Sequence, residues 1–102
     1  MPDNKIITDR EEMLEAVKID GEALQYASDT LKADREVVLE AVNNNGYALQ
    51  YADDTLKDDY EIVFEAINND SGPLEYASEK LQNDPQIENH AEVHNFLKKI
   101  IE

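Results

Sequence analysis

The chain repeats itself with a period of 25 residues. Residues 9–33 read "DREEMLEAVKIDGEALQYASDTLKA", residues 34–58 read "DREVVLEAVNNNGYALQYADDTLKD", and residues 59–83 read "DYEIVFEAINNDSGPLEYASEKLQN". A unit this short cannot bury an apolar face by itself, so neighbouring units must stack to form a common core. Three units are about the fewest that make a stable array. The sequence therefore predicts one domain over residues 1–102.

Each unit divides into two expected helices. In the middle unit, Asp34 is a favourable N-cap for a first helix that covers "REVVLEAVNN". Asn45 and Gly46 end this helix, because glycine readily adopts the left-handed conformation that closes a helix. A shorter second helix carries "YALQYA", and the chain turns back at "DDTLK", where Leu56 holds the return loop. The expected fold is all-α, a short α-solenoid of stacked helical hairpins.

The N-terminal end of the array departs from the repeat. Position 12 is Glu where the equivalent residues are Val37 and Ile62, as expected if no unit packs on that side. Ile6 falls one period before Leu31. This register indicates that the N-terminus carries the tail of another unit.

The C-terminal end departs from the repeat after Asp84. The following residues form one amphipathic pattern, which predicts a capping helix over about residues 84–102. Its apolar stripe consists of Val93, Phe96, Leu97, Ile100 and Ile101.

The Asp-Arg-Glu start, the Ala-Val pair, the Gly turn and the Ala-Leu-Gln-Tyr-Ala block together resemble a known repeat. It is the repeat catalogued as domain of unknown function 4116, and the resemblance covers roughly residues 9–83. The resemblance implies a helical-repeat architecture that occurs in tandem arrays. It implies no activity and no catalytic residues. The segment "NDSGPLEYA" of the third unit and the whole C-terminal tail depart from the family pattern.

The charge balance is strongly acidic, with 24 Asp plus Glu, 9 Lys plus Arg and a formal net charge of −15. Such a surface repels phosphate backbones and anionic lipids, so we expect no binding of nucleic acid and no binding of membranes. A basic protein or peptide would be attracted. The N-terminus shows no secretory signal, and no apolar stretch is long enough to span a bilayer. We expect a soluble cytoplasmic protein.

No pattern of residues predicts catalysis. The chain has no cysteine, no Gly-rich phosphate loop and no nucleophile elbow. His90 and His94 are spaced for zinc on one helix face, but no third ligand is evident, so exposed titrating histidines are the better interpretation. Aligning Gly46 with the glycine of a calcium loop puts alanine at both end-ligand positions. We therefore expect no enzyme, no metal and no cofactor.

Glutamate recurs at two positions of every first helix. The earlier position lies where the helix dipole favours a carboxylate, but the later one lies too far along the helix for that benefit. Stacked units would align all six carboxylates on one surface. They are either a solvated face inherited by duplication or an acidic strip that binds a basic protein segment. The two sets are Glu11, Glu36 and Glu61, and Glu15, Glu40 and Glu65.

Tyrosine recurs at the margin of the apolar face of the second helices, as Tyr26, Tyr51 and Tyr76. A ring at this position packs against the neighbouring unit and leaves its hydroxyl at the rim. The alternative is an exposed ladder that grips a peptide.

The leading hypothesis from the sequence is a protein-interaction module that uses the acidic face, with the tyrosines at its edge. One alternative is an acidic mimic of nucleic acid, in which Glu15, Glu40 and Glu65 would form the core. Another is a structural spacer within a longer repeat array.

Overall fold

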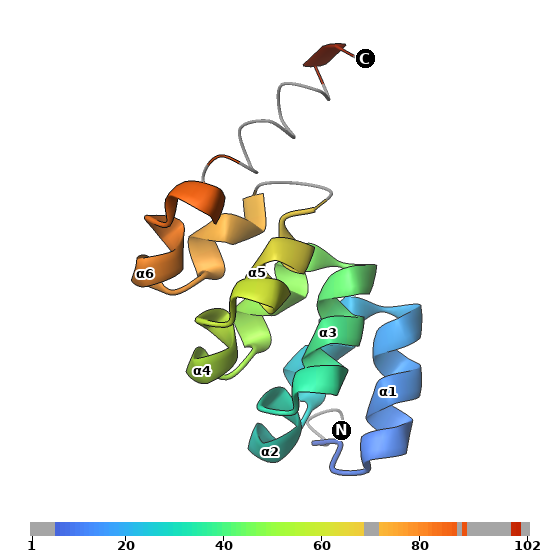
Figure 1. Ribbon diagram of the computed structural model, residues 1–102. Helices are drawn as coiled ribbons and strands as arrows, with labels where there is room; N and C mark the ends of the chain where they lie inside the picture. Colours follow the sequence, from blue (N-terminus) through green and yellow to red (C-terminus); the bar gives the residue numbers. More distant parts are fainter. Residues whose placement is uncertain (1–5, 69–71, 88, 90–98, 101–102) are drawn as a thin grey trace.

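Helices account for nearly all of the regular structure. The computed structural model describes residues 6–68, 72–87, 89, 99 and 100, and within these ranges the one exception is an isolated bridge between Ile7 and Ala27. In Figure 1 the units follow one another along the molecule: α1, α3 and α5 form one row, and α2, α4 and α6 form another. The predicted all-α class is confirmed.

Each unit contains three helical segments in the same order: an α-helix, a 3-10 helix and a one-turn α-helix. In chain order they are α1 (Arg10–Ile19), η1 (Gly21–Tyr26), α2 (Asp29–Lys32), α3 (Arg35–Asn44), η2 (Gly46–Tyr51), α4 (Asp54–Lys57), α5 (Tyr60–Ala66), η3 (Gly72–Tyr76) and α6 (Glu79–Gln82). The predicted first helix matches α3 at both ends. The predicted second helix is a 3-10 helix, and the predicted return loop is itself helical, so a two-helix hairpin describes the unit incompletely.

Side-chain caps explain why the return segment becomes a helix. The Ser28 hydroxyl accepts a hydrogen bond from the Leu31 N–H at 3.3 Å, and the Ser78 hydroxyl accepts one from the Leu81 N–H at 3.2 Å. In the middle unit the Asp53 carboxylate accepts from the Thr55 N–H at 3.0 Å. Each cap satisfies a free donor of the first turn. The buried leucine that follows then fastens the turn to the core.

The core runs through all three units along equivalent positions. Leu31, Leu56 and Leu81 are all buried, and the same holds for Met13, Val38 and Val63, and for Val17, Val42 and Ile67. Position 12 confirms the predicted asymmetry of the array. Glu12 is exposed at the outer edge of α1, whereas Val37 and Ile62 have no exposed surface.

The glycines are required by close packing. The prediction that Gly46 closes the helix in a left-handed conformation is wrong. None of them has a φ in the left-handed region. Asn45, which follows α3, is extended at φ −151° and ψ 107°. A Cβ on Gly46 would lie 2.0 Å from the Ala66 carbonyl oxygen of the next unit, and a Cβ on Gly21 would lie 2.3 Å from that of Ala41. Glycine therefore allows the 3-10 helix of one unit to touch the backbone of the next.

The third unit moves its glycine by one position, and the structure gives the reason. A Cβ on Gly72 would lie 2.1 Å from the hydroxyl of Tyr47. Tyr47 stands one period before Gly72, so its ring occupies the space that this glycine leaves open. The ring of Tyr47 also meets that of Tyr76 edge to face, with centroids 6.4 Å apart.

The N-terminal segment continues the register of the repeat. The Ser28 N–H donates to the Ile7 carbonyl at 2.9 Å. Its equivalent Asp53 donates to the Lys32 carbonyl, one period after Ile7, also at 2.9 Å. Ile7 thus occupies the place of a preceding unit's last turn, as the sequence register indicates, although Ile6 is 53% exposed.

The predicted C-terminal cap lies mostly outside the described residues, and so do His90 and His94. At its start, Asp84 accepts a hydrogen bond from the Gln86 N–H at 2.8 Å, residues 85–87 are helical, and Ile87 has no exposed surface. Of the predicted apolar stripe, only Ile100 is described, and it is 64% exposed. Within the described ranges, no helix is long and apolar enough to cross a membrane.

Candidate functional site

Neighbouring units are joined by a charged contact that we call the clasp: an arginine of one unit held by an aspartate and a glutamate of the next. In the first clasp, the Arg10 Nε donates to Asp34 Oδ2 at 2.6 Å. The Nη2 of the same side chain donates to Asp34 Oδ1 at 3.3 Å and also to Glu36 Oε1. The planar guanidinium thereby bridges two carboxylates with one edge, which is the geometry in which arginine binds most specifically.

The second clasp repeats the first one period later. The Arg35 Nε donates to Asp59 Oδ2 at 2.8 Å, and its Nη2 donates to Asp59 Oδ1 at 3.3 Å and to Glu61 Oε1. At the third junction a neutral pair takes the equivalent positions. The Tyr60 hydroxyl donates to Gln86 Oε1 at 2.9 Å.

The aspartate of each clasp also begins a helix. Asp34 Oδ1 accepts from the Glu36 and Val37 N–H groups at 3.1 and 3.3 Å, and Asp59 Oδ1 accepts from the Ile62 N–H at 3.2 Å. The arginine hydrogen bond is the largest cause that lowers the pKa of Asp34 and of Asp59, and the bonds from the helix N–H groups add to it. The same contacts raise the pKa of both arginines. One carboxylate therefore both caps its own helix and binds the preceding unit.

Acid should weaken these junctions. A carboxyl whose pKa is lower in the folded than in the unfolded chain contributes stability above its unfolded value and loses it as the pH falls through its folded value. We expect the free energy of unfolding to decline once the pH falls below about 4, the ordinary value for aspartate. Urea denaturation between about pH 7 and about pH 2 measures this decline.

The matched control for the acid experiment is the double variant D34N/D59N. Asparagine remains a good N-cap but cannot titrate. Its profile should be flatter than that of the wild-type protein across the acid range. Equal slopes for the two proteins would contradict the assignment of acid sensitivity to the clasps.

The clasps change the interpretation of the first set of glutamates. Glu36 and Glu61 are bound to arginines of the preceding unit, so their structural role is explained. Glu11 has no such partner among the described residues. The sequence contains the signal for this contact: each arginine precedes an aspartate by 24 residues and a glutamate by 26, which places them in adjacent units. That signal is visible only once the repeat is read across unit boundaries.

The second set of glutamates lines the outer surface of the long helices. Glu40 and Glu65 line one shallow depression together with Leu39 and Asn43. Glu65 also borders a second depression, where the rings of Tyr60 and Phe64 stack with centroids 5.7 Å apart. Adjacent units thus bring these carboxylates together.

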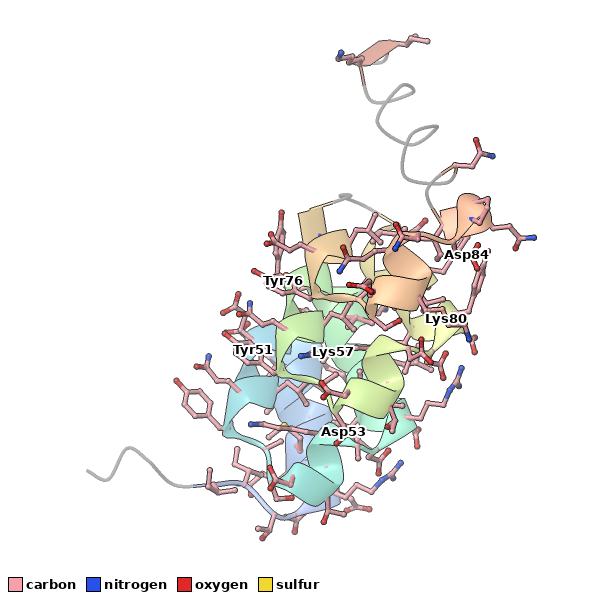
Figure 2. The ribbon with its side chains drawn as sticks, turned by 90° about the vertical axis from the view of Figure 1, so that its left-hand side faces the viewer. Tyr51, Asp53, Lys57, Tyr76, Lys80 and Asp84 are labelled. Atoms are coloured by element: carbon pink, nitrogen blue, oxygen red, sulfur yellow. The ribbon has the colours of Figure 1, made fainter. Side chains whose placement is uncertain are left out.

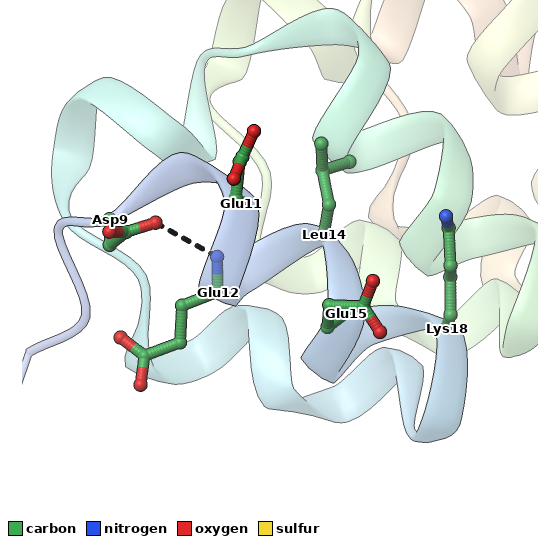
Figure 3. A pocket seen from close by; sticks show the side chains of 6 residues that line it. All are labelled: Asp9, Glu11, Glu12, Leu14, Glu15 and Lys18. Atoms are coloured by element: carbon green, nitrogen blue, oxygen red, sulfur yellow. Dashed lines mark hydrogen bonds between the residues drawn. The ribbon is translucent and has the colours of Figure 1, made fainter.

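Glu15 belongs to a third depression at the start of the array, shown in Figure 3, whose lining is formed by Asp9, Glu11, Glu12, Leu14, Glu15 and Lys18. Lys18 is the cation of this group. Its equivalent in the second unit is Asn43, so no cation lines the depression between Glu40 and Glu65 among the residues that the structure describes. Its described lining consists of an apolar side chain, an amide and two carboxylates.

The structure places the tyrosines apart from these depressions. Tyr51 and Tyr76 are half-buried against the core, whereas Tyr26 is 45% exposed at the end of the array. Figure 2 shows Tyr51 and Tyr76 pointing outward along one edge of the molecule. Burial is the main cause that raises the pKa of Tyr51, and the nearby charge of Glu22 adds to it. None of the three depressions is lined by a tyrosine of this column.

The described residues offer no cluster for a metal. No group of three or more His, Cys, Asp or Glu side chains in that part of the chain is arranged to hold one. The acidic side chains instead lie along the helices and at their starts, where they cap, pair or face solvent.

The repeating segments and their clasps define a class of protein, the all-helical tandem-repeat proteins. Within this class the chain belongs to the family described as a domain of unknown function (DUF4116), whose model matches residues 9–57, 34–82 and 59–89. The matches begin at residues 9, 34 and 59, in step with the repeat, which confirms the resemblance seen in the sequence. No curated protein and no solved structure matches the chain.

Proposed function

We propose that the chain is a non-catalytic interaction module, a short α-solenoid whose outer acidic face binds a basic segment of another protein. The observation that carries this proposal is the depression lined by Leu39, Glu40, Asn43 and Glu65. Two carboxylates from adjacent units flank an apolar side chain there. This arrangement suits an amphipathic segment that presents lysine or arginine beside an apolar residue.

Electrostatics favour this surface over the rest of the glutamates. Both described arginines are bound in clasps, and Glu36 and Glu61 are partly neutralised by them. Glu40 and Glu65 have no ion pair among the described residues, and the net charge of −15 adds a long-range attraction for basic partners. The clasps also pair two of the six carboxylates, Glu36 and Glu61, with arginine, which disfavours a mimic of nucleic acid that uses all six.

The second candidate function is that of a structural spacer in a longer array. The clasps and the backbone hydrogen bonds between units favour it, because both fix the position of one unit on the next. A spacer requires no exposed carboxylate to bind anything. The two functions therefore differ in whether the outer face binds a basic ligand.

Titration with a synthetic amphipathic peptide of leucine and lysine at helical spacing tests the proposal. Amide chemical shifts of the labelled protein should change most around Leu39, Asn43 and Glu65. The variant E40Q/E65Q should bind about tenfold more weakly, because it removes two ion pairs that contribute up to about 1 kcal/mol each. The fitted dissociation constants of the two proteins give the comparison.

The variant D29N/E79Q is the matched control, since it makes the same change in net charge on the exposed one-turn helices α2 and α6. It should change the affinity less than about twofold, a small effect typical of a distant screened charge. Equal weakening by both variants would mean that only net charge attracts the peptide. Either that result or no binding by the wild-type protein would leave the spacer as the better candidate.

A further inference from the structure

The start of α1 carries the same pair of acidic residues that holds arginine in both clasps. Asp9 and Glu11 stand one period before Asp34 and Glu36. Asp9 Oδ1 accepts from the Glu12 N–H at 2.9 Å, just as the clasp aspartates cap their own helices through Oδ1. In both clasps the other oxygen, Oδ2, takes the arginine Nε. No ion pair at Asp9 or Glu11 is formed within the described residues.

This third pair is open to solvent. Asp9 is exposed, whereas Asp34 and Asp59 are partly covered by their arginines and retain 22% and 23% of their side-chain surface. Asp9 and Glu11 line the depression in Figure 3, where Glu11 rises on the same side as Leu14 and Lys18 and Glu12 points away. Both acceptor residues are thus present at an accessible edge.

We propose that Asp9 and Glu11 form a binding site for an arginine side chain of a partner protein. The chain itself shows twice how such a pair holds a guanidinium, with Nε and Nη2 on the aspartate and Nη2 also on the glutamate. Lysine cannot reproduce this two-pronged contact, because its ammonium is a single point of charge. The site therefore selects arginine over lysine.

Glu12 restricts what can carry this arginine. Its equivalents Val37 and Ile62 are completely buried between units, so a further repeat packed in the same way would bury the Glu12 carboxylate. Burying an unpaired charge is strongly unfavourable. The arginine therefore comes from a partner segment that contacts the Asp9–Glu11 end of the edge and leaves Glu12 in water. This site refines the proposed function, since both expect a basic partner, but it is separate from the Glu40–Glu65 depression.

Comparing oligoarginine with oligolysine peptides of equal length tests the site. We expect the wild-type protein to bind the arginine peptide about threefold more tightly than the lysine peptide. At a solvent-exposed acidic pair, a bidentate guanidinium contact is only slightly more favourable than the single contact of an ammonium group. The variant D9N/E11Q should lose this preference and bind the two peptides equally. Its asparagine would still cap α1, so the fold is retained. Fluorescence anisotropy of labelled peptides gives the four dissociation constants.

The variant E40Q/E65Q separates this inference from the proposed function. It should weaken both peptides by a similar factor and keep the arginine preference, because it leaves the Asp9–Glu11 pair intact. An arginine preference that persists in D9N/E11Q overturns the assignment, as does a wild-type protein with no preference. Loss of the preference in E40Q/E65Q alone would place the arginine contact at the outer face, and this too would overturn it.

Discussion

Replacing Gly46 by alanine should separate the third unit from the second, at a cost of about 3 kcal/mol in the free energy of unfolding. The added methyl group would meet the Ala66 carbonyl oxygen at 2.0 Å and the Ala66 carbonyl carbon at 3.0 Å. Both atoms belong to the backbone of α5, so no side-chain rotation can relieve the contact, and α5 must move as a whole. Urea denaturation followed by circular dichroism measures the cost.

Gly72→Ala is the natural comparison for this substitution. The new methyl group would also come too close to its neighbour, at 2.1 Å, but that neighbour is the hydroxyl at the end of the Tyr47 side chain. A side-chain end can swing aside, so we expect a cost of about 1 kcal/mol. Hydrogen exchange should show lost protection in the third unit for G46A alone. Equal urea midpoints for G46A and the wild-type protein would contradict the packing role of this glycine.

A glutamate in place of Val37 should unfold the array or detach α1 from it. Val37 has no exposed surface and belongs to the core shared by the units. A carboxylate there would lose its water without gaining a cation, which costs about 4 kcal/mol or more. That is a large part of the total stability of a small domain. Loss of the helical circular dichroism signal, or a large fall in the urea midpoint, is the expected result.

The reverse exchange, Glu12→Val, provides the control at the equivalent position of the first unit. Glu12 is exposed, so the substitution should change the free energy of unfolding by no more than about 0.5 kcal/mol. It should instead add an apolar patch to the outer edge of α1 and promote self-association, which analytical ultracentrifugation detects. If V37E had the wild-type midpoint, the buried column would not hold the units together.

The repeat and its helix starts could be read from the sequence because they depend on residues close together in the chain. Asp34 predicts the start of α3 through its own side chain, and the structure shows that cap. Burial of the leucine and valine columns follows from the need of short units to stack. The exposed Glu12 follows from the same reasoning at the end of the stack.

Features that depend on the distance between units could not be predicted in this way. Gly46 suggests a left-handed turn when only its own unit is considered, but its role depends on a carbonyl group 20 residues further on. The 3-10 geometry of η2 likewise depends on how tightly that segment lies against its neighbours. Tyr47 and Gly72 each differ from the residues at the equivalent positions of the other units. Neither residue alone therefore predicts the contact between them.

The candidate site was predicted in part. The sequence singles out Glu40 and Glu65, and the structure places both around one depression. The helix dipole separates them from Glu36 and Glu61 in the sequence, but the pairing of Glu36 and Glu61 with arginines of the preceding unit becomes visible only in the structure. The tyrosine column is placed at the margin of the core, as the packing interpretation expects, and its use by a partner stays a prediction.

The clasp gives each of the first two junctions a direction. Each of the first two units carries an arginine donor on the side of the next unit and an acidic acceptor pair on the side of the previous one. Duplicating the middle unit in the gene would therefore create a new junction whose donor and acceptor already match. The third unit has Tyr60 as its donor and Gln86 as the matching acceptor, a neutral pairing that the other junctions do not share. A copy of the middle unit would therefore match the clasps, whereas the junction after the third unit depends on the neutral pair.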